Sequence, residues 1–354
     1  MSTLRDIEFL KATLGSGLLP DWTNLEVAAL RRLIEEDLTR KMESRAEGGD
    51  HGEQDLAEAA KMSQEATTSI PPSSMAVNGR FILLSATQEL NSVLETAKIL
   101  GMRYQEVKIR PLPVAHVVHW KYGSAEIPIF VCVAVSQRVD ALASLIQLII
   151  SAFSPKSIML AGMMGGIPGK IGFLDVVAPT AIYDGRVVGT RAKKLTVEPE
   201  SAPVHPSVHL ILNNIAEFRC GGQPIVVKKN KKSITVAAKI DDITHKLFKT
   251  IILPDRENIV GFEMEGQAVV NSNLFQQLSE TNVIMGMMKG VADFGGMQSG
   301  QSVAELDLVR QQINYSTDDG DFDPIENKKV KEKLQKEATR RAFVVAAEVS
   351  VRVS

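Results

Sequence analysis

The sequence predicts an α/β fold in which a β-sheet is covered on both faces by helices. From residue 80 onward, short apolar runs alternate with longer segments of helical periodicity. The strand-like runs are apolar almost without interruption, which is typical of strands that are buried on both faces. Some of them end in glycines or an acid, at the carboxyl ends of strands, where ligands of such sheets usually bind.

The predicted elements follow one another from residue 80 to the end of the chain. We expect strands at 81–85, 127–135, 157–161, 175–178, 180–184, 225–228, 233–238 and 283–289. We expect helices at 89–100, 139–153, 207–218, 266–277 and 328–350. Two segments are interpreted as turns: the glycines of 162–166 as a tight turn after a strand, and the lysines of 228–232 as a solvated hairpin turn.

The first 79 residues differ in character from the rest. Residues 1–43 are predicted to be a short helical appendage, because Thr23 and Glu26 form a capping box and apolar residues then recur at helical spacing. This appendage is either an accessory helical hairpin or a surface that docks a protein partner. Residues 44–79 are predicted to be a flexible linker, because they have too few aromatic and branched residues for a core. The main domain is therefore expected at 80–354.

Composition excludes several classes of function. The net charge of −2 gives no broad basic field for nucleic acid or an anionic membrane. The two cysteines, Cys132 and Cys220, lie far apart and form no CxxC motif, which favours a reducing compartment. The chain shows neither the pattern of a signal peptide nor an apolar run long enough to span a bilayer. We therefore expect a cytoplasmic protein.

Two acidic motifs suggest chemistry at a bond between a sugar and a base. The first, FEMEG at 262–266, carries Glu263 and Glu265, and the second, KGVAD at 289–293, places Asp293 at the end of an apolar strand. One carboxylate can hold ribose hydroxyls while another acid handles a proton on the leaving base. Each motif alone also fits a structural role, because acids are favourable at helix starts and turns.

The order of the motifs resembles a known family. From about residue 80 to 354, the chain is similar to the nucleoside phosphorylase and nucleosidase superfamily, which includes the methylthioadenosine/adenosylhomocysteine nucleosidases. The matching pieces are 81–89, 160–166, 173–178 with Tyr183-Asp184, 262–266 and 289–293. The resemblance implies a three-layer α/β fold around a central mixed sheet. It also implies a homo-oligomer that needs no metal or organic cofactor.

The resemblance implies that the first acidic motif, FEMEG, binds the sugar. Glu265 is expected to bind the ribose 2′- and 3′-hydroxyls, and Met264 to pack on the sugar. Glu263 and Phe262 belong to the same expected substrate-binding segment.

The resemblance also implies which residues contact the base, orient the water and bring the backbone close to the ligand. Asp293 is expected to hydrogen-bond or protonate the purine at N7, which improves the leaving group. Glu89 lies where a nucleosidase acid orients water, although as a first-turn acid it also fits its own helix. Gly162 and Gly165 are expected to approach the ligand closely.

Three departures from the family pattern keep other functions open. Ala292 stands where members often have serine, Gly295-Gly296 replace an acid, and 233–238 lacks the usual Ser-Gly-Asp. Phosphorolysis needs an arginine-rich phosphate clamp, for which Arg138 is the one well-placed candidate. Because Glu89 is present and there is no clear clamp, the sequence favours hydrolysis of a purine nucleoside or nucleotide over phosphorolysis. The third alternative is a catalytically weak nucleoside-binding or scaffold protein. The expected partner is a small-molecule nucleoside or nucleotide, with no nucleic acid and no membrane.

Overall fold

The computed structural model describes residues 76–112, 115–136, 139–167, 169–184, 201–235, 258–278, 282–294 and 324–353. Within these ranges, the side chains of residues 201, 274–278, 293–294 and 324–331 are left out of the description. The chain divides into two compact units, Met1–Gly52 and Glu53–Ser354, and every described residue belongs to the second. The predicted appendage at 1–43 and the candidate clamp Arg138 lie outside the described residues.

The folded part extends to the N-terminal side of the predicted boundary. Ala76 is fully buried in the main core, and the backbone amide of Asn78 donates to the carbonyl of Phe153 at 2.9 Å. Residues 76–79 were assigned to the linker, but they are packed against the domain. The predicted start of the domain at residue 80 is therefore too late, and the rest of the predicted linker lies outside the described residues.

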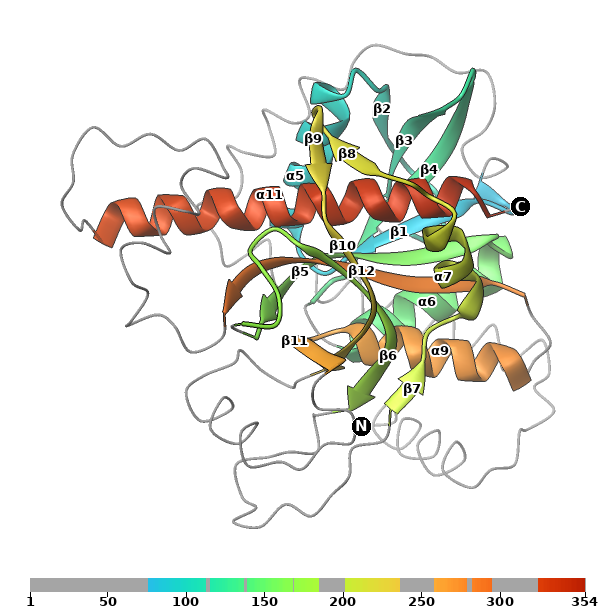
Figure 1. Cartoon of the computed structure of the whole chain (residues 1–354). Helices are drawn as coiled ribbons and strands as arrows, with labels where there is room; N and C mark the ends of the chain where they lie inside the picture. The colour runs from blue at the N-terminus through green and yellow to red at the C-terminus, as the bar shows by residue number, and fades with distance from the viewer. Residues whose placement is uncertain are drawn as a thin grey trace, which may run out of the picture. The chain divides into compact units, whose positions relative to one another are not determined.

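Ten strands of the described residues form one mixed sheet (Figure 1). They are β1 (Arg80–Leu84), β2 (Tyr104–Val107), β3 (Ala115–Tyr122), β4 (Ala125–Val133), β5 (Ser157–Gly166), β6 (Val176–Asp184), β7 (Ser201–Pro203), β10 (Val227–Thr235), β11 (Ile259–Glu263) and β12 (Ile284–Phe294). The order is β11-β10-β6-β12-β5-β1-β4-β3-β2, with β7 paired to β6. The central strands β4, β1, β5 and β12 are parallel, whereas β3 and β6 run antiparallel to their neighbours β4 and β12.

Strand β11 closes part of the sheet into a ring. It pairs in parallel with β10 and antiparallel with β5, where Gly261 lies opposite Gly166 and Phe262 opposite Gly165. Because β5, β12, β6 and β10 are consecutive neighbours in the sheet, this second pairing joins five strands edge to edge. The end of β11 is thereby held beside the ends of β5 and β12.

Helices cover both faces of the sheet. They include α5 (Thr87–Ile99), α6 (Val139–Phe153), α7 (Pro206–Asn213), α9 (Gly266–Leu278) and α11 (Pro324–Val351). The strands β8 (Phe218–Cys220) and β9 (Gln223–Ile225) form a separate small hairpin. Figure 1 shows α11 crossing one side of the sheet, in contact with α5 and α7, while α6 and α9 pack together on the other side. No helix in the described ranges is both long and apolar enough to cross a membrane. The predicted α/β class with a central mixed sheet is confirmed.

Both segments interpreted as turns are strands in the structure. Residues 162–166 continue β5, because β12 and β11 supply partners for their backbone. Residues 228–232 lie inside β10, which pairs with β6 on one side and β11 on the other. Asn230 has a positive φ of 59°, and the register with β6 shifts around it, so the lysine segment holds an irregularity within one strand and not a hairpin.

The contact between β12 and α11 leads to a first prediction. A Cβ added to Gly290 would lie 2.2 Å from the carbonyl oxygen of Ala338 in α11, which is far inside van der Waals distance. Gly290→Ala should therefore push α11 away from the sheet and lower the free energy of unfolding by about 1–3 kcal/mol in urea denaturation. Gly286→Ala on the same strand is the matched control, because its nearest neighbour is a side-chain atom of Val208 at 2.9 Å. Equal stability of the two variants would contradict the backbone contact.

Candidate active site

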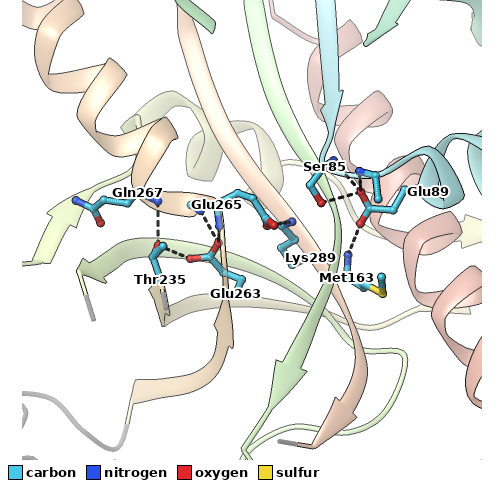
Figure 2. A network of polar contacts seen from close by, with 10 residues as sticks. Ser85, Glu89, Met163, Thr235, Glu263, Glu265, Gln267 and Lys289 are labelled. Atoms are coloured by element: carbon cyan, nitrogen blue, oxygen red, sulfur yellow. Dashed lines mark hydrogen bonds and ion pairs between the residues drawn. The ribbon is translucent and has the colours of Figure 1, made fainter. Parts of the chain in front are cut away.

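Four buried charged side chains meet where β5, β11 and β12 lie side by side (Figure 2). Glu89 comes from the first turn of α5, Glu263 and Glu265 from the junction of β11 and α9, and Lys289 from β12. Their exposed fractions are 2%, 3%, 4% and 0%, respectively. Burial of charge at this density requires each group to be paired or hydrogen-bonded.

The carboxylate of Glu89 both caps its helix and reaches β5. Its Oε2 accepts hydrogen bonds from the amide of Ser85 at 2.8 Å, the hydroxyl of Ser85 at 3.0 Å and the amide of Ala86 at 3.2 Å. Its Oε1 accepts from the amide of Met163 at 3.2 Å. Burial raises the pKa of Glu89, although the neighbouring Lys289 opposes this rise. The two roles considered for this residue, helix start and site acid, are compatible in the structure.

Gly162 lies directly against two of the charged groups. Its φ is +149°, and a Cβ added to it would lie 2.3 Å from Oε1 of Glu89 and 3.1 Å from Nζ of Lys289. Any larger residue would therefore occupy the place of the Glu89 carboxylate. Glycine is needed here so that the carboxylate of Glu89 and the ammonium of Lys289 can both approach the backbone of β5.

Lys289 is the cation that joins the acids. Its Nζ donates to Oε2 of Glu265 at 2.9 Å. Burial alone would lower the pKa of Lys289, but the carboxylates of Glu265, Glu89 and Glu263 together raise it, so the side chain is a charged ammonium at neutral pH. The sequence analysis quoted Lys289 only as the start of a motif and missed its role. The available signal was a single charge within an apolar strand, which must be paired if it is buried.

The two glutamates of the FEMEG motif lie in different environments. In the described part of the chain, Oε1 of Glu265 has no hydrogen-bond donor, whereas Oε2 is bound to Lys289. Glu263 instead accepts bonds on both oxygens, from the hydroxyl of Thr235 and from the amides of Glu265 and Gly266. Burial and the nearby Glu265 carboxylate raise the pKa of Glu263 to about 7, against the opposing effects of Lys289 and the hydrogen bonds.

The remaining predicted residues are only partly placed at the charge cluster. Phe262 is buried in a small apolar cluster against which Met264 packs. Gly165 lies in β5 between Phe262 and Asp293, its partners in β11 and β12. The backbone of Asp293 is therefore placed beside the junction of the three strands, but its side chain is not among those described.

The arrangement suits a reaction in which positive charge develops on the substrate. Three carboxylates surround one ammonium in the described part of the site, so the local charge is negative when all four groups are ionised. Cleavage of a glycosidic bond passes through an oxocarbenium-like state on the sugar. Fixed carboxylates in a site shielded from water stabilise such a state strongly.

Comparison with known proteins identifies the fold. No protein-family model and no curated protein matches the chain. Among solved structures, the 5′-methylthioadenosine/S-adenosylhomocysteine nucleosidase of Helicobacter pylori matches with a TM-score of 0.50 and 16% identity, over 77% of this chain and 98% of that one. The corresponding nucleosidase of Colwellia psychrerythraea 34H matches with a TM-score of 0.51 and 12% identity, over 78% and 96%. The chain has the nucleosidase fold.

The nucleosidase fold confirms the family resemblance at the level of architecture. With identities of 16% and 12%, the two structures support the fold of the chain but give no evidence of its reaction. Within this chain, the pairing of β5 with both β11 and β12 brings the acids from α5, β11 and the α9 junction together (Figure 2). The chemistry itself has to be argued from the residues.

Proposed function

We propose that this protein hydrolyses the N-glycosidic bond of a purine nucleoside or nucleotide and releases the free base. The observation that carries this proposal is the buried group of Glu89, Lys289 and Glu265 on a nucleosidase fold. The two similar structures are both named as nucleosidases, and that of Colwellia psychrerythraea is a complex with adenine.

Glu265, Glu89 and Asp293 act on the substrate or on the water in the proposed reaction. Oε1 of Glu265 accepts a hydrogen bond from a ribose hydroxyl, while Lys289 holds Oε2 and fixes the direction of the carboxylate. Glu89 orients the attacking water, with the rotatable hydroxyl of Ser85 giving up its place on Oε2. As the bond from C1′ to the base nitrogen breaks, its electron pair stays on the base. Asp293 supplies a proton to the base at N7, and the water oxygen bonds to C1′ and loses its proton to Glu89.

The charge of the site favours water over phosphate. Lys289 is the one cation that the described residues place at the cluster, and it is already bound to Glu265. A phosphate ion would meet the carboxylates of Glu89, Glu263 and Glu265 without a free cation to balance its charge. The carboxylates repel an anion and leave neutral water as the nucleophile. This argument supports hydrolysis over phosphorolysis.

The test is product analysis with and without phosphate. Purified protein is incubated with a panel of purine nucleosides and nucleotides, and the products are separated by chromatography. We expect the same rate of base release in both buffers, with free ribose or a 5′-substituted ribose as the second product. Strict dependence on phosphate, with ribose 1-phosphate formed, would reject hydrolysis. Binding of a nucleoside without release of base would show a binding protein on the same fold.

Homo-oligomerisation, a partner for residues 1–43 and a cytoplasmic location stay predictions.

A further inference from the structure

Glu263 and Thr235 together cap the start of α9. The first backbone amides of a helix have no partner within the helix itself. Here the amides of Glu265 and Gly266 donate to Oε2 of Glu263, the first at 2.7 Å. The amide of Gln267 donates to the hydroxyl oxygen of Thr235 at 2.9 Å, and the same hydroxyl donates to Oε1 of Glu263 (Figure 2). Three successive amides are thus held by two side chains.

This cap leaves little of Glu263 available to a ligand. Its carboxylate is buried with an exposed fraction of 3%, and both oxygens already accept hydrogen bonds. A Cβ added to Gly266 would lie 2.6 Å from Oε1, so the backbone of the turn is tight against the carboxylate on that side. Thr235 is fully buried and comes from β10, 28 residues earlier in the chain.

We propose that Glu263 and Thr235 are positioning residues, which fix the backbone of 264–266 so that the Glu265 carboxylate meets Lys289. This inference rests on the proposed glycosidase function and replaces the expectation that Glu263 belongs to the substrate-binding residues. Glu265 lies between two constraints: its amide is held by Glu263 at 2.7 Å, and its carboxylate is held by Lys289 at 2.9 Å. If the hydrogen bond from the Glu265 amide to Glu263 is lost, the backbone of the turn can move, because Lys289 holds only the side chain of Glu265.

The geometry also accommodates a change of protonation in the cap. Among the described residues, Glu265 and Lys289 are the charged groups that act on the pKa of Glu263, which is about 7. When Glu263 is protonated, its hydroxyl can donate to the oxygen of Thr235, which has a second lone pair beside the one used by Gln267. The hydrogen bond from Thr235 lowers the pKa of Glu263, so removal of that hydroxyl moves the protonation to higher pH.

The test compares Thr235→Val with Thr235→Ser and with a control on another strand. Thr235→Val should lower kcat by on the order of 10- to 100-fold, because small displacements of a catalytic group are costly. Thr235→Ser keeps the hydroxyl and should rescue most of the loss. Thr180→Val is the matched control, because Thr180 is a sheet threonine whose hydroxyl donates to the carbonyl of Lys231 at 3.2 Å. It should leave kcat unchanged.

Two further readouts separate positioning from a merely structural role. In a Glu265→Gln background, Thr235→Val should have almost no further effect, because residues that act through one group are not additive. The acid limb of the pH profile should move to higher pH in Thr235→Val, and in Glu263→Gln only the part that protonation of Glu89 contributes should remain. Full additivity, or an acid limb that stays in place in both variants, would overturn the proposal. Glu263→Gln serves as the second variant if Thr235→Val does not fold.

A crystal structure of Thr235→Val makes the test independent of turnover. We expect the contact between Glu265 and Lys289, 2.9 Å in the wild type, to be broken in the variant. An unchanged contact would overturn the positioning role even if activity falls. If the wild type releases no base from any nucleoside, the proposed function fails, whereas the crystallographic result still decides whether the cap positions Glu265.

Discussion

Replacement of Lys289 by methionine should lower the free energy of unfolding at pH 8 by about 3–5 kcal/mol, the usual cost of removing one partner from a buried ion pair. The ammonium is fully buried and bound to Glu265, and it also acts on Glu89 and Glu263. Methionine has a similar length and fills the space, so the loss measures charge and not packing. Base release should fall below detection, because Glu265 loses the group that orients it.

The same substitution should give a characteristic pH dependence. Without the cation, the pKa values of Glu89 and Glu263, which burial already raises, rise further in the folded state. At a pH between the ordinary carboxyl pKa values of the unfolded chain and the raised values of the folded variant, the folded variant binds more protons than the unfolded chain. Its free energy of unfolding therefore increases as the pH falls. The difference between wild type and Lys289→Met should therefore be larger at pH 8 than at pH 5.5.

Urea denaturation at these two pH values measures the effect, with a surface lysine as control. Lys228 forms an ion pair with Asp175 at 3.5 Å, and its side chain is 38% exposed. Lys228→Met should cost no more than about 1 kcal/mol, as is usual for surface pairs. If both variants lose the same stability, or if Lys289→Met is equally stable at the two pH values, the cluster does not depend on its lysine.

The second large effect is expected at Asp293, where asparagine should lower turnover on the order of 100-fold or more, the range for loss of a general acid. The backbone of β12 places Asp293 opposite Gly165, beside the end of β11. Asparagine keeps the shape and a hydrogen-bond donor but has no proton to transfer to the base. The free energy of unfolding and the binding of nucleoside should change little.

Steady-state kinetics at saturating nucleoside measures this loss of turnover, and a substrate with a better leaving group makes the test more specific. A nucleoside with an activated base needs less protonation, so the difference between wild type and Asp293→Asn should shrink with such a substrate. Asp140→Asn is the matched control, because Asp140 is an exposed acid in the first turn of α6. An Asp293→Asn variant as fast as the wild type would make Asp293 a structural residue.

The sequence predicts a helix or strand well when the apolar residues of that one segment recur with the period of the element. The helix at 139–153 was predicted with the bounds that α6 has, because its buried apolar residues recur at helical spacing. The lysine segment at 228–232 was misread, because the charged side chains conceal a strand that is held by pairing with β6 and β11. No local pattern reports such pairing. The glycines of β5 were misread for the same reason.

The candidate site shows the same division. Glu89 and Glu265 were found because short motifs carry them, and the structure brings both close to Lys289. Glu263 was expected to bind the substrate, and its hydrogen bond to Thr235 was not foreseen, because that bond joins segments 28 residues apart. Lys289 received no role, because the acids that raise its pKa come from α5 and from the junction before α9. Contacts between distant segments depend on topology, which the motifs do not contain.

The ring of five strands also bears on the order in which the candidate site is assembled during folding. Its last pairing joins residue 166 to residue 261, so the chain between them has to be organised before the ring can close. Such distant pairings form slowly, because the entropy of loop closure is lost before the contacts are gained. Helices and the early strands β1 to β4 can therefore be native while the acids are still apart. In refolding, helical circular dichroism should recover first and the proposed glycosidase activity later, in a separate kinetic phase.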